Sequence, residues 1–258
     1  MTARISSGLD GAPDQVDLVV IGLGVTGAGV ALDAASRGLK VLAVDAHDIA
    51  FGTSRWSSKL VHGGLRYLAS GQVGIAHESA VERGILMERT APHLTRPLPW
   101  LLPLMKNVSF RQATLASAGF RTGDLLRLVA RTSRRTLPRP RRVSGAVAHR
   151  LAPALRSSEL RGGLINWDGQ LEDDARLVTC LARTAVSHGA DVRTRLRALK
   201  ATGTHVSLRD ELTGQTTTIS TRAVINAAGV WAGDVVDEIR LRPAAAPTWS
   251  CGPSPFLA

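Results

Sequence analysis

Three glycines near the start of the chain have the spacing of a phosphate-binding turn. Gly22, Gly24 and Gly27 follow a short apolar run, residues 16–22, and precede small and apolar residues at helical spacing. The first glycine permits a tight turn, the second lets a pyrophosphate approach the backbone, and the third lets the helix pack on the strand. The start of such a helix offers unpaired N–H groups and a positive dipole. The turn is therefore expected to bind the pyrophosphate of a dinucleotide.

An acidic residue ends the next apolar run, residues 40–45. Asp45 lies 23 residues after Gly22, at a position where a carboxylate accepts hydrogen bonds from a ribose diol. The same charge repels a 2′-phosphate, which disfavours NADP. The two runs and the helix between them form a β-α-β unit with a right-handed crossover.

A polar, glycine-containing segment, residues 51–64, follows this unit. It leads into the stretch SSKLVHGGLRYL, which resembles the flavin loop of FAD-dependent glycerol-3-phosphate dehydrogenases, members of the amino-acid-oxidase-like flavoprotein group. The resemblance spans roughly residues 16–242 and includes APHLTRPLPWLLP, DGQLEDDARLV and INAAGVWAGDV. The chain departs from the family pattern at Leu23, where glycine is usual, and at Asp45, where glutamate is commoner. It departs again at Val230, where proline is usual.

The resemblance implies FAD as the cofactor. It implies that the serine-lysine-histidine stretch lines the flavin or its phosphates, and that backbone after the INAAG strand touches the phosphate–ribitol side. The predicted cofactor-binding residues are Gly22, Gly24, Gly27, Asp45, Thr53, Ser54, Ser57, Ser58, Lys59, His62, Gly63, Ala228 and Gly229. The residues alone leave other interpretations open: the serines would cap a helix, and Trp231 would belong to the core.

The implied substrate, glycerol 3-phosphate, is a dianion whose phosphate needs a guanidinium that binds it with two hydrogen bonds. By resemblance Arg66 is that residue and Tyr67 is a hydroxyl donor beside it; the alternative is a surface arginine. The implied reaction oxidises the C2 hydroxyl to a ketone, gives dihydroxyacetone phosphate, and passes electrons through FAD to a quinone. Two alternatives remain: an FAD-dependent amine or amino-acid oxidase of the same group, or a non-catalytic basic fragment that binds lipid or nucleic acid.

The sequence after residue 243 departs from the family pattern. The family has a strand resembling SRGTHLVV there, with a histidine proposed as the catalytic base, whereas residues 244–251 read AAAPTWSC. When the expected peptide is back-translated into GC-rich codons and that DNA is translated one base later, the product is AAAPTWSC. The interpretation is that residues 243–258 are an aberrant, frameshifted tail and that the chain is truncated. We therefore assign no catalytic residue, and expect weak FAD binding without useful turnover.

The elements that would position these residues alternate between strands and helices. Helices are expected at 25–37, 74–90, 111–133 and 171–188, strands at 162–169, 190–194 and 222–229, and a hairpin at 204–210 and 216–221. This order predicts an α/β fold, with a doubly wound Rossmann-type FAD-binding domain and an incomplete antiparallel substrate domain. The predicted organisation is a disordered leader at 1–15, an FAD-binding domain at 16–90 and 162–235, and a substrate or cap segment at 91–161.

Two local expectations concern charged side chains. Glu78, Glu82 and Arg83 should lie on the exposed face of helix 74–90. Asp168, Asp173 and Asp174 match a family motif, but the residues themselves favour a capping role, because acids at the start of a helix are stabilised by its dipole.

Composition limits the remaining possibilities. The chain has 258 residues, 44 % hydrophobic and 21 % charged, which excludes disorder throughout, coiled coil and collagen. Two cysteines make no disulfide framework, and the histidines lack metal-ligand spacing, so no metal site is expected. No apolar run is long enough to span a membrane, and the leader lacks a signal-peptide core. These features predict a cytoplasmic protein.

Much of the net charge of +11 comes from one segment. Residues 111–150 hold ten arginines and a single acid, Asp124. Three interpretations remain open: a solvated face, a peripheral contact with the anionic inner face of the cell membrane, and nucleic-acid binding. Nucleic-acid binding is the least favoured, because the segment lacks an aromatic stacking platform.

Overall fold

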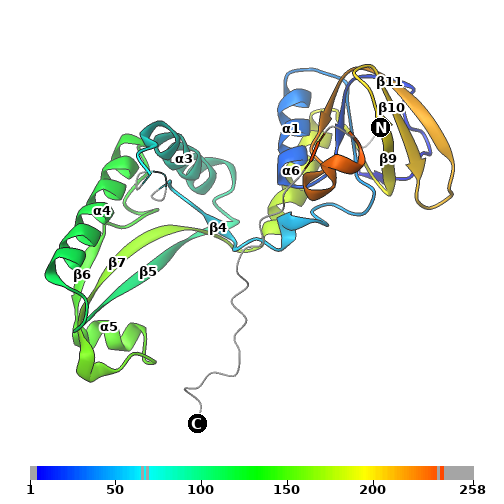
Figure 1. The fold of residues 1–258 in the computed structure, drawn as a ribbon. Helices are drawn as coiled ribbons and strands as arrows, with labels where there is room; N and C mark the ends of the chain where they lie inside the picture. The colour runs from blue at the N-terminus through cyan, green and yellow to red at the C-terminus, as the bar shows by residue number, and fades with distance from the viewer. Residues whose placement is uncertain (1–4, 65–66, 68–69, 237–238, 241–258) are drawn as a thin grey trace, which may run out of the picture. The chain divides into compact units, whose positions relative to one another are not determined.

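The computed structural model describes residues 5–64, 67, 70–236 and 239–240, and its chain forms two compact units (Figure 1). Unit 1 comprises Met1–Ser54 and Val178–Ala258, and unit 2 comprises Arg55–Leu177. The first unit is thus discontinuous in sequence. The sequence predicts the domain boundaries at residues 90/91 and 161/162. The structure has them at residues 54/55 and 177/178.

Unit 1 is built on a seven-stranded sheet in the order β1-β8-β3-β2-β11-β10-β9. Strands β1, β8, β3, β2 and β11 pair in parallel, and β10 pairs antiparallel with both β11 and β9. The α/β class with a Rossmann-type parallel sheet is confirmed. The strands are β1 Ser6–Ser7, β2 Gln15–Ile21, β3 Val41–Val44, β8 Asp191–Thr194, β9 Leu196–Ala201, β10 His205–Asp210 and β11 Thr216–Asn226.

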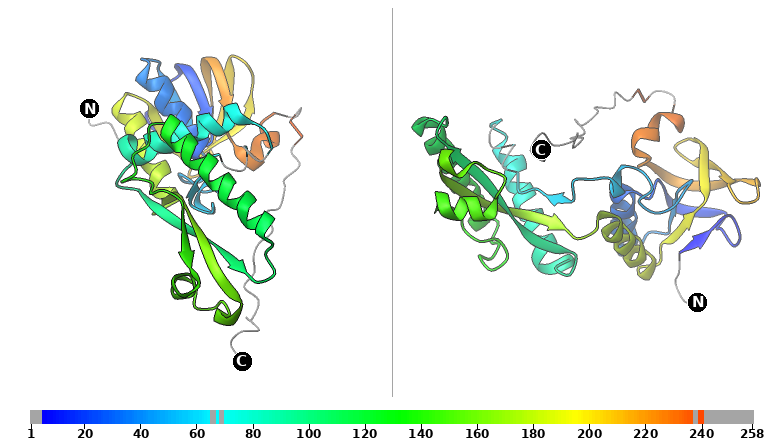
Figure 2. Two further views of the ribbon diagram at one scale, coloured as in Figure 1. Left: turned by 90° about the vertical axis from the view of Figure 1, so that its left-hand side faces the viewer. Right: turned by 90° about the horizontal axis from the view of Figure 1, so that it is seen from below.

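Two helices cover one face of this sheet, α1 (Val25–Ser36) and α6 (Asp174–Ser187), and Figures 1 and 2 show them next to one another. Alanines of both helices pack on Leu18 and Val20 of β2 in one buried cluster. Leucines and valines of β9 and β10 pack with the opposite face of β2 and β3 in a second cluster. Burial on both faces explains why β2 and β3 are almost wholly apolar.

Residues 5–15 belong to the leader that the sequence predicts to be disordered, but they have defined positions in the structure. Strand β1 pairs in parallel with β8, and Ser7 Oγ lies 2.8 Å from Thr194 Oγ1. The buried guanidinium of Arg193 donates hydrogen bonds to three carbonyl oxygens of this segment, those of Gly8, Asp10 and Gly11. A buried charge needs such partners, and the leader provides them.

Unit 2 contains an antiparallel sheet in which β7 (Leu160–Leu171) is central. Strand β5 (Thr95–Met105) pairs along one side of β7, and β4 (Leu60–Val61) and β6 (Arg141–Ser144) pair with it at other positions. In the described part of unit 2, three α-helices accompany the sheet, and α3 and α4 contact each other through the cluster of Ala76, Ala80 and Leu126. The helices are α3 Val73–Ile85 with its π-helical continuation Leu86–Thr90, α4 Phe110–Val129 and α5 Gly145–Leu151.

A stretch rich in proline forms strand β5. Among the described strands, only β7 pairs with β5, so the other side of β5 is an edge of the sheet. Pro97, Pro99 and Pro103 alternate along it in regular register with β7. A proline in such a register has its nitrogen on the side away from the partner, where it removes donors that another strand would need. This edge is therefore poorly suited to strand addition.

Arg83, which was expected on an exposed helix face, and Arg127 of the arginine-rich segment are both buried. Arg83 is 7 % exposed and Arg127 is 4 % exposed, and each is paired with a carboxylate. Leu126, which also belongs to the arginine-rich segment 111–150, is buried. Other apolar side chains of α4 remain exposed, including Leu115, Leu125 and Val129. Within the described part of the chain, no helix has the length and apolar character that crossing a membrane requires.

Candidate functional site

The glycine turn of unit 1 joins the end of β2 to the start of α1, and it is closely packed. A Cβ atom on Gly22 would lie 2.5 Å from the carbonyl oxygen of Ala227, and one on Gly27 would lie 1.8 Å from the carbonyl oxygen of Gly22. Gly22 also has a φ of +103°, which L side chains rarely adopt. These contacts account for glycine at both positions and bring the INAAG segment, residues 225–229, beside the turn.

The first turn of α1 carries no acidic side chain that would repel an anion. Its N-cap, Gly24, makes no side-chain cap. The hydroxyl of Ser54 accepts a hydrogen bond from the N–H of Val25 at 2.9 Å. A neutral hydroxyl and backbone N–H groups at a helix start suit a pyrophosphate. The structure thus brings Ser54, predicted as a cofactor contact, to the predicted turn.

Asp45 connects the turn with the loop after β3. One carboxylate oxygen accepts from the N–H of Leu23 at 2.8 Å, and the other accepts from the N–H of His47 at 2.8 Å. Each carboxylate oxygen has a second lone pair for another donor. A ribose diol beside the turn would therefore find an oriented acceptor.

Aromatic rings lie near the second predicted backbone contact, Ala228–Gly229. The ring centroids of His47 and Phe51 are 4.1 Å apart, and that of Trp231 is 6.5 Å from each. Trp231 packs against Gly52, where an added Cβ would lie 2.8 Å from the indole ring. Trp231 is 44 % exposed, so the prediction that it belongs to the core is wrong.

In unit 2, the serine-lysine end of the predicted flavin loop is held by Asp174. Both the N–H and the hydroxyl of Ser57 donate to Asp174 Oδ2, at 3.1 and 2.8 Å, and the ammonium of Lys59 lies 3.4 Å from the same carboxylate. The carbonyl of Lys59 accepts from the N–H of Leu171 at 2.7 Å. Burial raises the pKa of Asp174, but these hydrogen bonds, with Ser57 first, bring the pKa below its ordinary value.

The histidine-glycine end of the same loop is held by Asp168. This carboxylate accepts from Gly63 N–H at 3.2 Å and from Arg83 Nη1 at 2.7 Å, and it lies 3.3 Å from His62 Nδ1. Burial raises the pKa of Asp168, and the hydrogen bond with His62 and the charge of Arg83 outweigh it, so that the pKa lies below the ordinary value. The guanidinium of Arg83 packs on Gly63, where a Cβ would lie 2.0 Å away.

The capping role expected for the three acids holds for one of them. Asp173 accepts from the N–H of Arg176 at 3.1 Å at the start of α6. Asp168 and Asp174 instead hold the two ends of the loop 57–63. The sequence did not reveal these contacts or the burial of Arg83, since the partners are more than 80 residues apart. The only signal was that the acids match a family motif.

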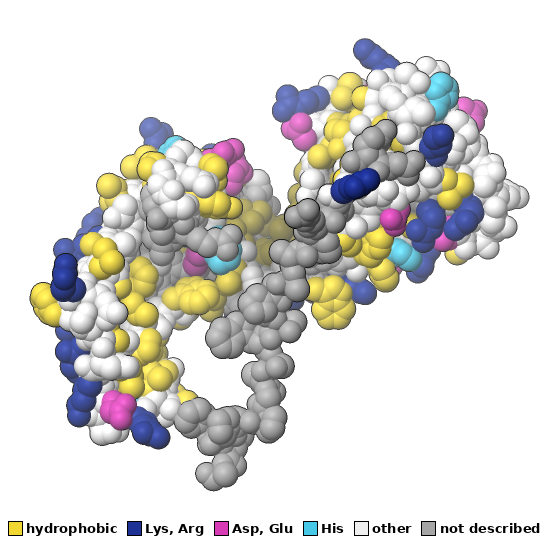
Figure 3. Space-filling model, in the orientation of Figure 1, with side chains coloured by type: hydrophobic (Ala, Val, Ile, Leu, Met, Phe, Trp, Pro, Cys, Tyr) yellow, Lys and Arg dark blue, Asp and Glu magenta, His cyan; other side chains and the backbone are white. Residues whose placement is uncertain are grey.

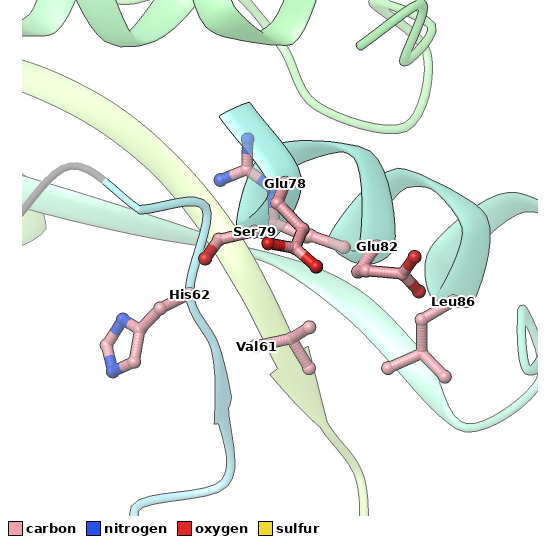
Figure 4. Close-up of a pocket in the computed structure, with 7 residues that line it drawn as sticks. Val61, His62, Glu78, Ser79, Glu82 and Leu86 are labelled. Atoms are coloured by element: carbon pink, nitrogen blue, oxygen red, sulfur yellow. The ribbon is translucent and has the colours of Figure 1, made fainter. Parts of the chain in front are cut away.

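Two large hollows meet at His62. One, of about 460 Å³, lies between His62, Val61 and α3 residues that include Glu78, Glu82 and Leu86 (Figure 4). In this view the imidazole of His62 points away from the side chains of α3. The other hollow, of about 490 Å³, is lined by Trp100, Leu101, Leu102, Phe120, Asn166 and Asp168 as well as His62. An apolar hollow with few polar groups suits a planar aromatic ligand.

The remaining predicted residues have diverse positions. Thr53 begins a short 3-10 helix, Thr53–Arg55, next to Ser54. Ser58 is exposed. Tyr67 is half-buried and packs against the α3–α4 cluster. Arg66, predicted to bind the substrate phosphate, and the predicted aberrant tail, 243–258, lie outside the described residues.

Comparisons with known proteins show the family of the chain. Residues 17–254 match the family model described as FAD dependent oxidoreductase. Glycerol-3-phosphate dehydrogenase 1 of Mycobacterium tuberculosis (strain ATCC 25618 / H37Rv) is 56 % identical over 243 residues, which are 93 % of this chain and 47 % of the relative. Aerobic glycerol-3-phosphate dehydrogenase of Staphylococcus aureus is 38 % identical over 86 % of this chain and 40 % of its own length. The chain therefore spans about half the length of the curated relatives it matches.

The chain is also similar to solved structures of proteins with bound FAD. The glycerol-3-phosphate dehydrogenase from Bacillus halodurans, complexed with FAD, has a TM-score of 0.58 and 31 % identity, over 86 % of this chain and 36 % of that chain. The L-alpha-glycerophosphate oxidase from Mycoplasma pneumoniae has a TM-score of 0.60 over 85 % of this chain and 55 % of that chain; at 18 % identity it shares the fold alone. Because the family model matches most of the chain, the chain belongs to the FAD-dependent oxidoreductase family.

Proposed function

We propose that this chain is the FAD-binding portion of a glycerol-3-phosphate dehydrogenase. The observation that carries the proposal is the start of α1, where the glycine turn, Ser54 and Asp45 together provide hydrogen-bonding groups for the ADP part of FAD. The close backbone packing at Gly22 and Gly27 leaves this surface without side chains that would cover a pyrophosphate. Asp45 would bind the ribose diol, and the backbone at Ala228 and Gly229 would approach the phosphate–ribitol side.

In unit 2, the loop 57–63 would face the flavin. Its two ends are held by carboxylates, so Lys59 and His62 have defined positions before any ligand binds, which lowers the entropic cost of binding. When bound, FAD supplies the hydride-accepting chemistry for oxidation at C2 of glycerol 3-phosphate, which gives dihydroxyacetone phosphate. Arg66 and Tyr67 would bind the substrate phosphate. The 56 % identity to a glycerol-3-phosphate dehydrogenase favours this substrate over an amine or amino acid.

We further propose that α4 contacts an anionic membrane surface on the cytoplasmic side, where a quinone would receive the electrons. Leu115, Leu125 and Val129 of α4 are exposed, and so are Arg121 of the same helix and Arg131 just beyond its end. Figure 3 shows Lys and Arg side chains along one margin of unit 2, beside hydrophobic side chains. A basic helix with exposed apolar residues suits the surface of an anionic bilayer better than nucleic acid.

The test is a titration of the purified chain with FAD, followed by the change in flavin fluorescence. We expect weak, saturable binding, reduced about tenfold or more by Asp45→Ala, because a bidentate contact to the ribose diol is lost. Asp33→Ala is the matched control, since Asp33 is an exposed acid on α1 that pairs with Arg37. Equal affinities of the parent chain and the Asp45 variant would refute the proposed ribose contact. We expect no glycerol-3-phosphate-dependent dye reduction by this chain alone.

A further inference from the structure

A small cavity inside unit 2 is lined by two buried arginines. It has a volume of about 30 Å³ and lies between α3, α4 and β7. Arg83 comes from α3 and Arg127 from α4, and their exposed fractions are 7 % and 4 %. The other polar lining residues are Asp124, Asn166, Trp167 and Asp168. The proposed function does not use this cavity.

Three N–H groups of the lining residues are buried without a hydrogen-bond partner in the described part of the chain. They belong to Arg83 Nε, Arg127 Nη2 and Trp167 Nε1. The other N–H groups of Arg127 are engaged: Nε donates to Asp124 at 2.7 Å, and Nη1 donates to the carbonyl of Thr132 at 2.6 Å. Buried donors are nearly always paired in folded proteins, so three unpaired donors on residues that line one cavity point to an acceptor inside it.

The charges around the cavity favour an anion over a neutral acceptor. Asp168 is paired with Arg83, and Asp124 is paired with Arg127. A third guanidinium, that of Arg139, does not line the cavity and its side chain is 55 % exposed, but it lies 3.8 Å from the other oxygen of Asp124. Asp124 is therefore shared between Arg127 and Arg139, so its single negative charge does not neutralise Arg127 alone.

We propose that this cavity binds one small monovalent anion of halide size, held by N–H groups of Arg83, Arg127 and Trp167. A water molecule needs at least about 10–15 Å³ of such volume, so the cavity has room for one halide but not for phosphate or sulfate. Water is the competing occupant. It accepts only two hydrogen bonds and must donate two of its own, whereas the unpaired groups of this wall are donors. A bound halide would connect α3 with α4 and β7.

Thermal unfolding of the whole chain tests the proposal. The midpoint is measured in sodium chloride, sodium bromide and sodium gluconate at one ionic strength, so that screening of the surface arginines is the same in each. We expect chloride and bromide to raise the midpoint by about 3 °C over gluconate at a concentration roughly ten times the dissociation constant. Equal midpoints in the three salts would overturn the proposal.

The variant Trp167→Phe assigns the effect to this cavity. It removes the indole N–H and keeps an aromatic ring, and we expect it to remove at least about half of the halide-dependent shift, because one of three donors is lost. The matched control is Trp100→Phe, the same change in the neighbouring hollow, which should keep the full shift. An unchanged shift in the Trp167 variant would overturn the assignment.

A crystal of the chain grown in sodium bromide provides a test that needs no variant. Anomalous scattering should place one bromide in the cavity, within about 3.5 Å of the Arg127 and Trp167 nitrogens. Density for water alone in that cavity, without an anomalous peak, would overturn the proposal.

Discussion

The predicted FAD contacts fall into two halves, one in each unit, that are built by different means. In unit 1, backbone atoms form the turn, and glycines at 22 and 27 permit carbonyl contacts closer than any side chain would allow. In unit 2, two carboxylates hold a loop by hydrogen bonds to its N–H groups, hydroxyl and charged side chains. The first half is therefore sensitive to added atoms, and the second is sensitive to removed charges.

The largest expected effect tests the first half of this comparison. Gly27→Ala should cost unit 1 about 3 kcal/mol or more and abolish FAD binding, because its Cβ would overlap the carbonyl of Gly22 and force the helix from the strand. Urea unfolding measures the loss of stability, and hydrogen exchange of peptides from β2 and α1 locates it. Gly29→Ala is the control: it lies on the same helix with no atom within 4 Å of its Cβ, and should stabilise by about 0.5–1 kcal/mol. Similar losses in both variants would contradict the contact.

The second prediction concerns the carboxylate of unit 2. Asp168→Ala should cost about 3 kcal/mol, because it leaves the buried guanidinium of Arg83 without its partner. Hydrogen exchange should rise in peptides that contain residues 60–64. Glu172→Ala, an exposed neighbour, is the control and should change stability by less than about 0.5 kcal/mol. Unchanged exchange at 60–64 in the Asp168 variant would show that the pair does not hold the loop.

The two carboxylates that hold the loop also predict a pH dependence in unit 2. The pKa of Asp168 and that of Asp174 are both lowered from 3.8 in the folded chain, so the unfolded chain binds more protons as the pH falls. Their contribution to stability is present above about pH 5 and is lost as the pH falls through the folded pKa values. Hydrogen exchange at several pH values should detect the loss in β4 and β7, and Asp168→Asn should reduce it. A parent and variant with identical profiles would contradict this origin.

The smallest expected effect is that of Lys59→Met. The Lys59 side chain is 40 % exposed and 3.4 Å from Asp174, so the pair should contribute at most about 1 kcal/mol to stability. The effect on FAD affinity should exceed the effect on stability if the ammonium faces the flavin. Lys106→Met, at an exposed lysine of unit 2, is the control. A loss of stability without a further loss of FAD affinity would assign Lys59 a structural role.

The sequence predicted the elements whose signals are local. Strand β2, helix α1 and strand β3 lie within two residues of their predicted bounds, since apolar runs, small residues and a closing glycine define them within 30 residues of chain. The short strands β1 and β6 were not predicted, because their pairing depends on distant strands rather than on their own pattern. The same reason applies to Arg83. Its position beside Glu82 suggests a solvent-exposed helix face, but it is buried against Asp168, which lies 85 residues away in the sequence.

The pairing of β11 with β2 determines how long a fragment of the chain must be to form the glycine turn. Its first half pairs antiparallel with β10, and its second half pairs parallel with β2 up to Asn226 and Ile21. The carbonyl of Ala227 then contacts Gly22. A fragment that ended before residue 216 would keep the entire glycine motif but would leave β2 without its neighbour on that side. A minimal nucleotide-binding fragment should consequently extend at least to residue 229, some 200 residues beyond the glycines that identify it.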